Sequence, residues 1–141
     1  MNRFLSSAFV ILIGLLVILV PTYILPVCPP TEIMANSHDH HITYKFMKCH
    51  WTSQAEIGIG TAMVVIGLII LLIKSTLIRL GLNISLLVIA MFVAAVPTVL
   101  IGVCPSEMMA CHIGTLPALL LLSGILFIGI LVNIFYLKRL S

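Results

Sequence analysis

The segment VPTYILPVCP at residues 20–29 recurs as VPTVLIGVCP at residues 96–105, with six of ten positions identical. A second motif, Met-x-Cys-His, occurs at residues 47–50 and again at residues 109–112. Shared hydrophobicity alone does not explain the matching Pro-Thr, Cys-Pro and Cys-His pairs. The chain is therefore predicted to be one integral membrane domain, residues 1–141, made of two repeats at about 4–74 and 79–138.

Long apolar runs surround both copies of the motifs. The chain is 62% hydrophobic and 8% charged, with a mean hydropathy of +1.30, whereas soluble domains have about a quarter of their residues charged. In lipid only helices and closed barrels satisfy the backbone, and runs of this length favour helices. The predicted spans are about Phe4–Leu25, Ile57–Ile73 (or from Thr52), Leu77–Val103 and Ile113–Leu137. The predicted fold is an all-α, four-transmembrane-helix bundle built from two parallel helix-loop-helix repeats.

The basic residues are unevenly distributed between the two predicted sides. One side carries Arg3, Lys74, Arg79, Lys138 and Arg139. Because cytoplasmic loops carry an excess of Lys and Arg, this predicts a multi-pass protein of the cytoplasmic membrane with both termini in the cytoplasm. The motif loops are then extracytoplasmic. The net charge of +3 reflects this topology, so it does not indicate a nucleic-acid partner.

The repeated motifs concentrate sulfur and imidazole groups on the predicted outer side. The candidate metal ligands are Cys28, Cys49, His50, Cys104, Cys111, His112, Met47 and Met109. Thiolate and imidazole bind zinc or copper, and thioether favours copper(I), with haem a weaker candidate. The same cysteines are also disulfide candidates, because thiols outside the cytoplasm tend to oxidise and bonds Cys28–Cys49 and Cys104–Cys111 would staple each half alike. Redox-active thiols are a third interpretation.

A second group of candidate ligands occurs in one repeat only. It comprises His38, His40, His41 and Glu56. The histidines form a short tract of the kind that binds divalent metals, although an exposed loop with incidental affinity is an equal alternative. Glu56 is near the outer end of the second span, where an ionisable residue is a functional candidate by default, and His50 or Lys48 is its expected partner.

Several residues within the spans predict local structure. Pro21 and Pro97 leave a helix carbonyl without a partner, and the following Thr can help to satisfy the backbone. Asn83 and Asn133 are expected to form interhelical hydrogen bonds. Small residues expected to allow close helix contact, either within the bundle or with a partner subunit, include Gly58, Gly60, Gly124 and Gly129.

The motif pattern resembles the bacterial membrane family catalogued as domain of unknown function 4418. The resemblance covers essentially the whole chain, through Cys28-Pro29, Cys104-Pro105 and the two Met-x-Cys-His motifs. Members are often encoded beside export-type ABC transporters, which implies an accessory membrane subunit with a transporter partner.

The chain is also similar to four-helix disulfide-generating oxidoreductases, which place two Cys pairs outside and both termini inside. However, neither pair here is Cys-x-x-Cys, and no outer Arg is present to hold a quinone. There is also no Ser-His-Asp set, phosphate loop or cofactor fingerprint. The leading hypothesis is therefore a non-enzymatic subunit that binds a transition metal or metal cofactor, with a disulfide-stapled structural subunit and a thiol oxidoreductase as alternatives.

Overall fold

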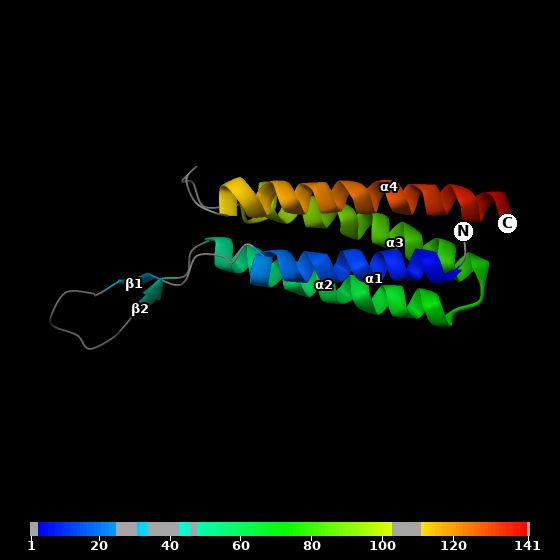
Figure 1. Ribbon diagram of the computed structural model, residues 1–141, viewed down its shortest axis with the longest axis horizontal. Helices are drawn as coiled ribbons and strands as arrows, with labels where there is room; N and C mark the ends of the chain where they lie inside the picture. Colours follow the sequence, from blue (N-terminus) through cyan, green and yellow to red (C-terminus); the bar gives the residue numbers. More distant parts are fainter. Residues whose placement is uncertain (1–2, 25–30, 34–42, 46–47, 103–110, 141) are drawn as a thin grey trace.

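The computed structural model describes residues 3–24, 31–33, 43–45, 48–102 and 111–140. Four long helices dominate this part of the chain (Figure 1). They are α1 (Arg3–Leu19), α2 (Lys48–Leu72), α3 (Thr76–Ala95) and α4 (Leu116–Leu140). The expected all-α four-helix membrane architecture is confirmed.

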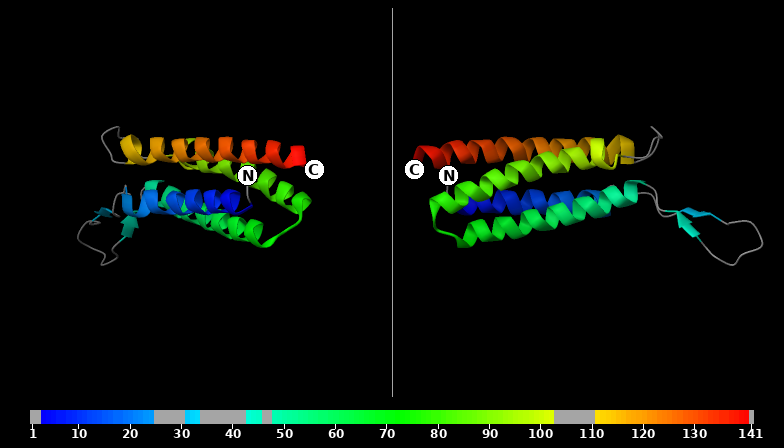
Figure 2. Two further views of the ribbon diagram at one scale, coloured as in Figure 1. Left: turned by 45° about the vertical axis from the view of Figure 1, so that its right-hand side comes forward. Right: turned by 180° about the vertical axis from the view of Figure 1, so that it is seen from behind.

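The helices form two antiparallel pairs that stack on each other. Helix α1 packs mainly against α2, and α3 packs mainly against α4. Figures 1 and 2 show these pairs as two layers, with the start of α1 and the end of α4 at the same end of the bundle. The connection from α2 to α3 is a tight turn of only three residues, Ile73–Ser75. We call the opposite end, where α2 begins, the motif end.

All four helices are long and apolar enough to cross a membrane. The four candidate spans are Phe4–Ile24, His50–Leu72, Thr76–Leu100 and Ile113–Arg139. The second helix begins at Lys48, before the predicted start at Ile57 and close to the alternative start at Thr52. Hydropathy favoured the later start because Thr52, Ser53 and Glu56 lower the local average, although all three are buried inside the bundle.

The two Val-Pro-Thr segments adopt the same structure. Each forms a five-residue π-helical turn, η1 (Val20–Ile24) and η2 (Val96–Leu100), that continues the preceding helix. Thr22 Oγ1 donates to the carbonyl oxygen of Ile18 at 2.8 Å, and Thr98 Oγ1 donates to that of Ala94 at 2.7 Å. These bonds use carbonyl groups near each proline, as predicted. The wider π-helical turn accommodates the proline, which has no N–H group to donate.

Burial follows the repeat in the first and third helices and shifts in the fourth. Positions 7, 10, 14, 17, 20 and 21 are buried, and so are positions 83, 86, 90, 93, 96 and 97, each 76 residues later. In contrast, buried positions 56, 60, 63, 67 and 70 of α2 correspond to 119, 123, 126, 130 and 133 of α4, which are 63 residues later. The Cys-His motifs are 62 residues apart, so the second repeat has one extra residue between its motif and the buried positions of α4. The π-helical turn η3 (Cys111–Thr115), just before Pro117, explains this shift.

Glycines allow the two helices of the first pair to approach closely. A Cβ atom added at Gly60 would lie 2.7 Å from Ile18 Cγ1 and 2.9 Å from the backbone oxygen of Gly14. A Cβ at Gly129 would meet the Phe9 ring at 2.5 Å, so α4 also approaches α1 closely. The packing prediction is confirmed at Gly60 and Gly129. The prediction of close packing within the bundle is wrong at Gly58 and Gly124, because a Cβ there would have nothing within 4 Å, and contact with a partner subunit stays a prediction there.

Polar groups join the helices near the termini. Asn133 Nδ2 donates to Ser6 Oγ and to Asn83 Oδ1, both at 2.8 Å. Asn83 Nδ2 donates in turn to the backbone oxygen of Arg79 at 2.7 Å. The predicted interhelical bonding of both asparagines is therefore confirmed, and it joins α1, α3 and α4. A cavity of about 10 Å³ beside this network has room for about one water molecule.

A short antiparallel hairpin, which hydropathy did not predict, projects from the motif end. Strands β1 (Thr31–Ile33) and β2 (Thr43–Lys45) pair with Glu32 opposite Tyr44. Figure 1 shows this hairpin beyond the helix ends. Three-residue strands carry too little alternation to be recognised from sequence.

Candidate binding site at the motif end

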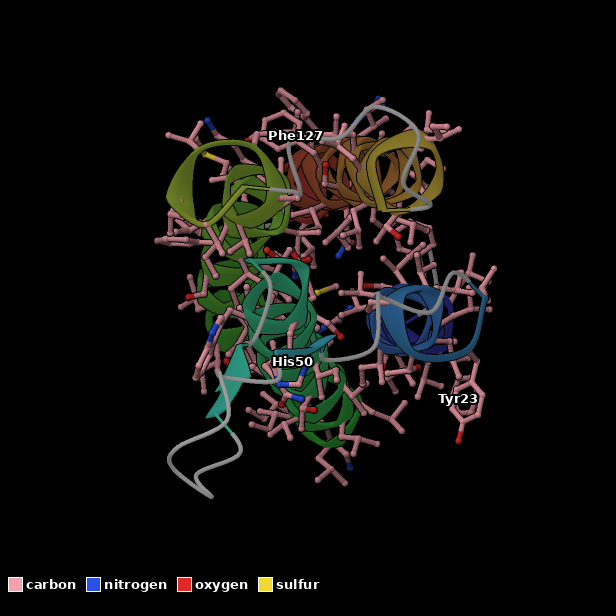
Figure 3. The ribbon with its side chains drawn as sticks, turned by 90° about the vertical axis from the view of Figure 1, so that its left-hand side faces the viewer. Tyr23, His50 and Phe127 are labelled. Atoms are coloured by element: carbon pink, nitrogen blue, oxygen red, sulfur yellow. The ribbon has the colours of Figure 1, made fainter. Side chains whose placement is uncertain are left out.

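The motif end gathers segments from both repeats. Turns η1 and η2 finish there, and α2 and η3 begin there. Figure 3 looks onto this end, with His50 at the start of α2 and Tyr23 pointing away from the bundle. Both Cys-His pairs, Cys49-His50 and Cys111-His112, therefore have their backbones at the same end of the molecule.

The structure describes only some of the predicted site residues. The side chains of His50 and Glu56 are described, and the backbones of Cys49, Cys111 and His112 are placed as the first residues of α2 and η3. The remaining candidates lie outside the described residues; these are Cys28, Cys104, Met47, Met109, His38, His40 and His41. Within the described ranges no three His, Cys, Asp or Glu side chains form a metal-binding group.

His50 is half-buried in the first turn of α2. Its ring lies 6.0 Å from the Trp51 ring, centroid to centroid, in an edge-on arrangement with an interplanar angle of 79°. Trp51 is exposed near the helix start, where an aromatic side chain suits the boundary between membrane and water.

Glu56 is the most unusual side chain of the described structure. It is 0% exposed, and neither carboxylate oxygen has a hydrogen-bond partner among the described residues. Burying an unpaired ionised carboxylate is very unfavourable, and buried charges are normally paired or coordinate metals. A fully buried carboxyl group with two unused oxygens is therefore a candidate ligand.

The prediction that His50 is the hydrogen-bonding partner of Glu56 is wrong. The two residues are six positions apart on one helix, which places them about 120° from each other around the helix axis. His50 therefore lies on a different face of α2 from the buried carboxyl group. The other predicted partner, Lys48, has a side chain outside the described residues.

Two buried hydroxyl residues occupy the turn of α2 that precedes Glu56. Thr52 is 4% exposed and Ser53 is 5% exposed, and residues three and four apart share a helix face. Thr52 Oγ1 donates to the carbonyl oxygen of Gly102 at 2.8 Å, which connects α2 to the second residue after η2. Gly102 has a φ of 77°, a left-handed conformation that glycine adopts without strain.

A third buried hydroxyl comes from the other repeat. Thr115, the last residue of η3, is 4% exposed, and its Oγ1 has no hydrogen-bond partner among the described residues. It is 62 residues after Ser53, the same spacing as between the Cys-His motifs. Turn η2 packs against both α2, which carries Ser53, and α4, which begins one residue after Thr115.

Sequence reasoning identified Glu56 but missed the buried hydroxyl residues at the same end of the bundle. We define the polar cluster as Thr52, Ser53, Glu56 and Thr115. The available signal was three polar residues at positions 52, 53 and 56, the spacing of one helix face in a mainly apolar span. Recognising Thr115 required the repeat spacing as well.

Comparison with known proteins gives one match. The model of the family described as domain of unknown function (DUF4418) matches residues 10–136. No significant match was found among curated proteins or among solved structures.

Proposed function

Because the chain belongs to the DUF4418 family and is a multi-pass membrane protein, we propose that it is a non-enzymatic accessory subunit of a membrane transport system that binds a transition metal through its paired motifs. The observation that carries the proposal is the common location of the two Cys-His pairs. One pair begins α2 and the other begins η3, and both elements start at the motif end.

The ligand chemistry supports a soft or borderline metal. Each repeat contributes two Cys, one His and one Met of the motif, which are ligand types for copper or zinc. The proposed ligands are Cys28, Cys49 and His50 from one repeat and Cys104, Cys111 and His112 from the other. The partner we propose is a transporter of the ABC exporter type, which would receive the metal or depend on it.

The proposed orientation places the motif end outside the cytoplasm. Lys138 and Arg139 lie in the last turn of α4, and Lys74 lies in the turn between α2 and α3. Both positions are at the end opposite the motifs. Excess positive charge on one side favours the cytoplasm for that side, and therefore favours a cytoplasmic-membrane protein with cytoplasmic termini.

The test counts free thiols and bound metal in the same sample. The intact chain is purified from membranes without chelator, its cysteines are alkylated and counted by mass spectrometry, and its metal content is measured. We expect free or metal-protected thiols with copper or zinc bound. The variant carrying His50→Ala and His112→Ala should lose the metal, while Gln54→Ala, an exposed change on α2, should retain it.

Other outcomes would identify the alternatives. A metal-free protein with all four cysteines in disulfides would contradict metal binding and indicate a stapled structural subunit. Cysteines that cycle between thiol and disulfide with added quinone or a thioredoxin-like protein would instead indicate a membrane oxidoreductase.

A further inference from the structure

In its ionised form, the buried carboxyl group of Glu56 needs a counter-charge that the described side chains do not supply. The basic side chains described by the structure are Lys74, Arg79, Lys138 and Arg139. Lys74 is 18 residues further along the chain, about 27 Å at the rise of a helix. Arg79, near the start of α3, and Lys138 and Arg139, near the end of α4, are also at the end of the bundle where α1 begins and α4 ends (Figure 1). None of these four cations is within reach of a carboxylate in the third turn of α2.

The buried polar groups near Glu56 on α2, and the buried hydroxyl of η3 at the same end of the bundle, offer oxygen atoms as ligands. Thr52 and Ser53 are on the preceding turn of the same helix face, and the carbonyl oxygen of Gly102 is held beside Thr52 by their hydrogen bond. Thr115 Oγ1, buried and without a hydrogen-bond partner among described residues, is the contribution of the second repeat. Carboxylate, hydroxyl and carbonyl oxygens suit hard cations, in contrast to the sulfur and imidazole groups of the motifs.

The single negative charge of the polar cluster favours a monovalent cation. Glu56 is its only ionisable member, and the other donors are neutral. One monovalent cation would neutralise the site, whereas a divalent cation would leave a net positive charge buried in the membrane span, which is costly.

We propose that Glu56, with Thr52, Ser53, Thr115 and the Gly102 carbonyl, forms a buried binding site for one alkali cation inside the motif end. The ion replaces its water with protein oxygens and neutralises the carboxylate. Through the Thr52–Gly102 contact, its binding also stabilises the junction between α2 and the end of η2. This site is separate from the Cys and His motifs and does not depend on their metal.

The experiment measures alkali-ion binding to the purified full chain in detergent. Binding is followed by equilibrium uptake of radioactive Na⁺ and by thermal unfolding in NaCl or KCl, with choline chloride at equal ionic strength as the control. We expect saturable binding of one ion per chain and a higher unfolding temperature in NaCl or KCl than in choline chloride, because a ligand that binds only the folded state stabilises it.

Variants assign the ion to the cluster. Glu56→Gln should abolish binding, and Ser53→Ala should weaken it several-fold while leaving the carboxylate in place. Gln54→Glu, which adds a carboxylate at an exposed position of the same helix, should bind one ion as the unaltered chain does. Should Glu56→Gln fail to fold, Ser53→Ala and Thr115→Val still test the site.

Three results would overturn the proposal. They are unfolding temperatures that are equal in sodium, potassium and choline chlorides, Na⁺ uptake that persists in Glu56→Gln, and an infrared band of a protonated Glu56 that Na⁺ leaves unchanged. Failure of the motif proposal is a distinct result, because the His50→Ala and His112→Ala variant should lose the transition metal and still bind Na⁺.

Discussion

Replacing Gly60 with alanine should destabilise the bundle by separating α1 from α2. The added methyl group would lie 2.7 Å from Ile18 Cγ1 and 2.9 Å from the backbone oxygen of Gly14. Both distances are below ordinary van der Waals contact. Neither neighbour is the free end of a flexible side chain, so relieving the overlap requires the two helices to move apart.

The change in stability on Gly60→Ala is the difference between a packing cost and a gain in helix propensity. Overpacking a well-packed interface typically costs about 1–3 kcal/mol. Alanine improves helix propensity over glycine by about 1 kcal/mol, which partly offsets that loss. We therefore expect Gly60→Ala to lower the free energy of unfolding by up to about 2 kcal/mol.

A matched control is available two residues earlier on the same helix. A Cβ atom at Gly58 would have nothing within 4 Å, so Gly58→Ala keeps the propensity gain without the overlap. It should leave stability unchanged or raise it by up to about 1 kcal/mol. Both variants therefore introduce the same methyl group, and only the packing differs.

Reversible unfolding in mixed micelles, followed by the fluorescence of the single tryptophan, Trp51, measures both free energies. Because the propensity gain is common to both variants, Gly60→Ala should be less stable than Gly58→Ala by the overpacking cost, about 1–3 kcal/mol. Equal stability of the two variants would refute the close approach of α1 and α2 at Gly60.

Three further changes can be tested with the same unfolding assay. Asn133→Leu should cost about 1–2 kcal/mol because it removes two interhelical hydrogen bonds, and a double-mutant cycle with either partner should be non-additive; additive effects would contradict the network. Gly102→Ala should cost about 1–2 kcal/mol because its φ is 77°, and no loss of stability would argue against that conformation. Gly129→Ala should cost less stability than Gly60→Ala, because the ring edge of Phe9 can rotate away whereas the Gly14 backbone oxygen cannot. Gly124→Ala, with open space around it, should cost no stability. A larger loss of stability at Gly129 than at Gly60 would contradict this order.

Much of the architecture was predictable because it depends on solvent and on local chemistry. A chain this apolar has to satisfy its backbone within each segment, so run length was enough to predict four spanning helices. The repeated Val-Pro-Thr segments each predicted a local break with a threonine hydroxyl on a nearby carbonyl, and both occur. Asn83 and Asn133 were predictable partners because an amide in an apolar span needs a hydrogen bond.

Other features depend on which helix faces meet. Gly58 and Gly60 were equivalent as small residues in the sequence, but only Gly60 faces Gly14 and Ile18. The one-residue shift of the buried face in α4 arises from the π-helical turn at η3, which motif spacing alone did not show. Helix rotation and approach are set by packing against neighbours, so a span's composition does not determine them.

The same distinction between sequence and tertiary packing applies to the candidate site. Residue types and spacing were sufficient to identify the duplicated Cys, His and Met motifs and to bring them to one end of a parallel repeat. The environment of Glu56 was decided by tertiary packing. The helical phase of α2 turns the carboxyl group away from His50 and into the bundle, where it is 0% exposed beside Thr52 and Ser53. Sequence supplies an ionisable group in an apolar span, but the neighbouring helices determine whether that group meets water, a partner side chain or a buried set of oxygen atoms.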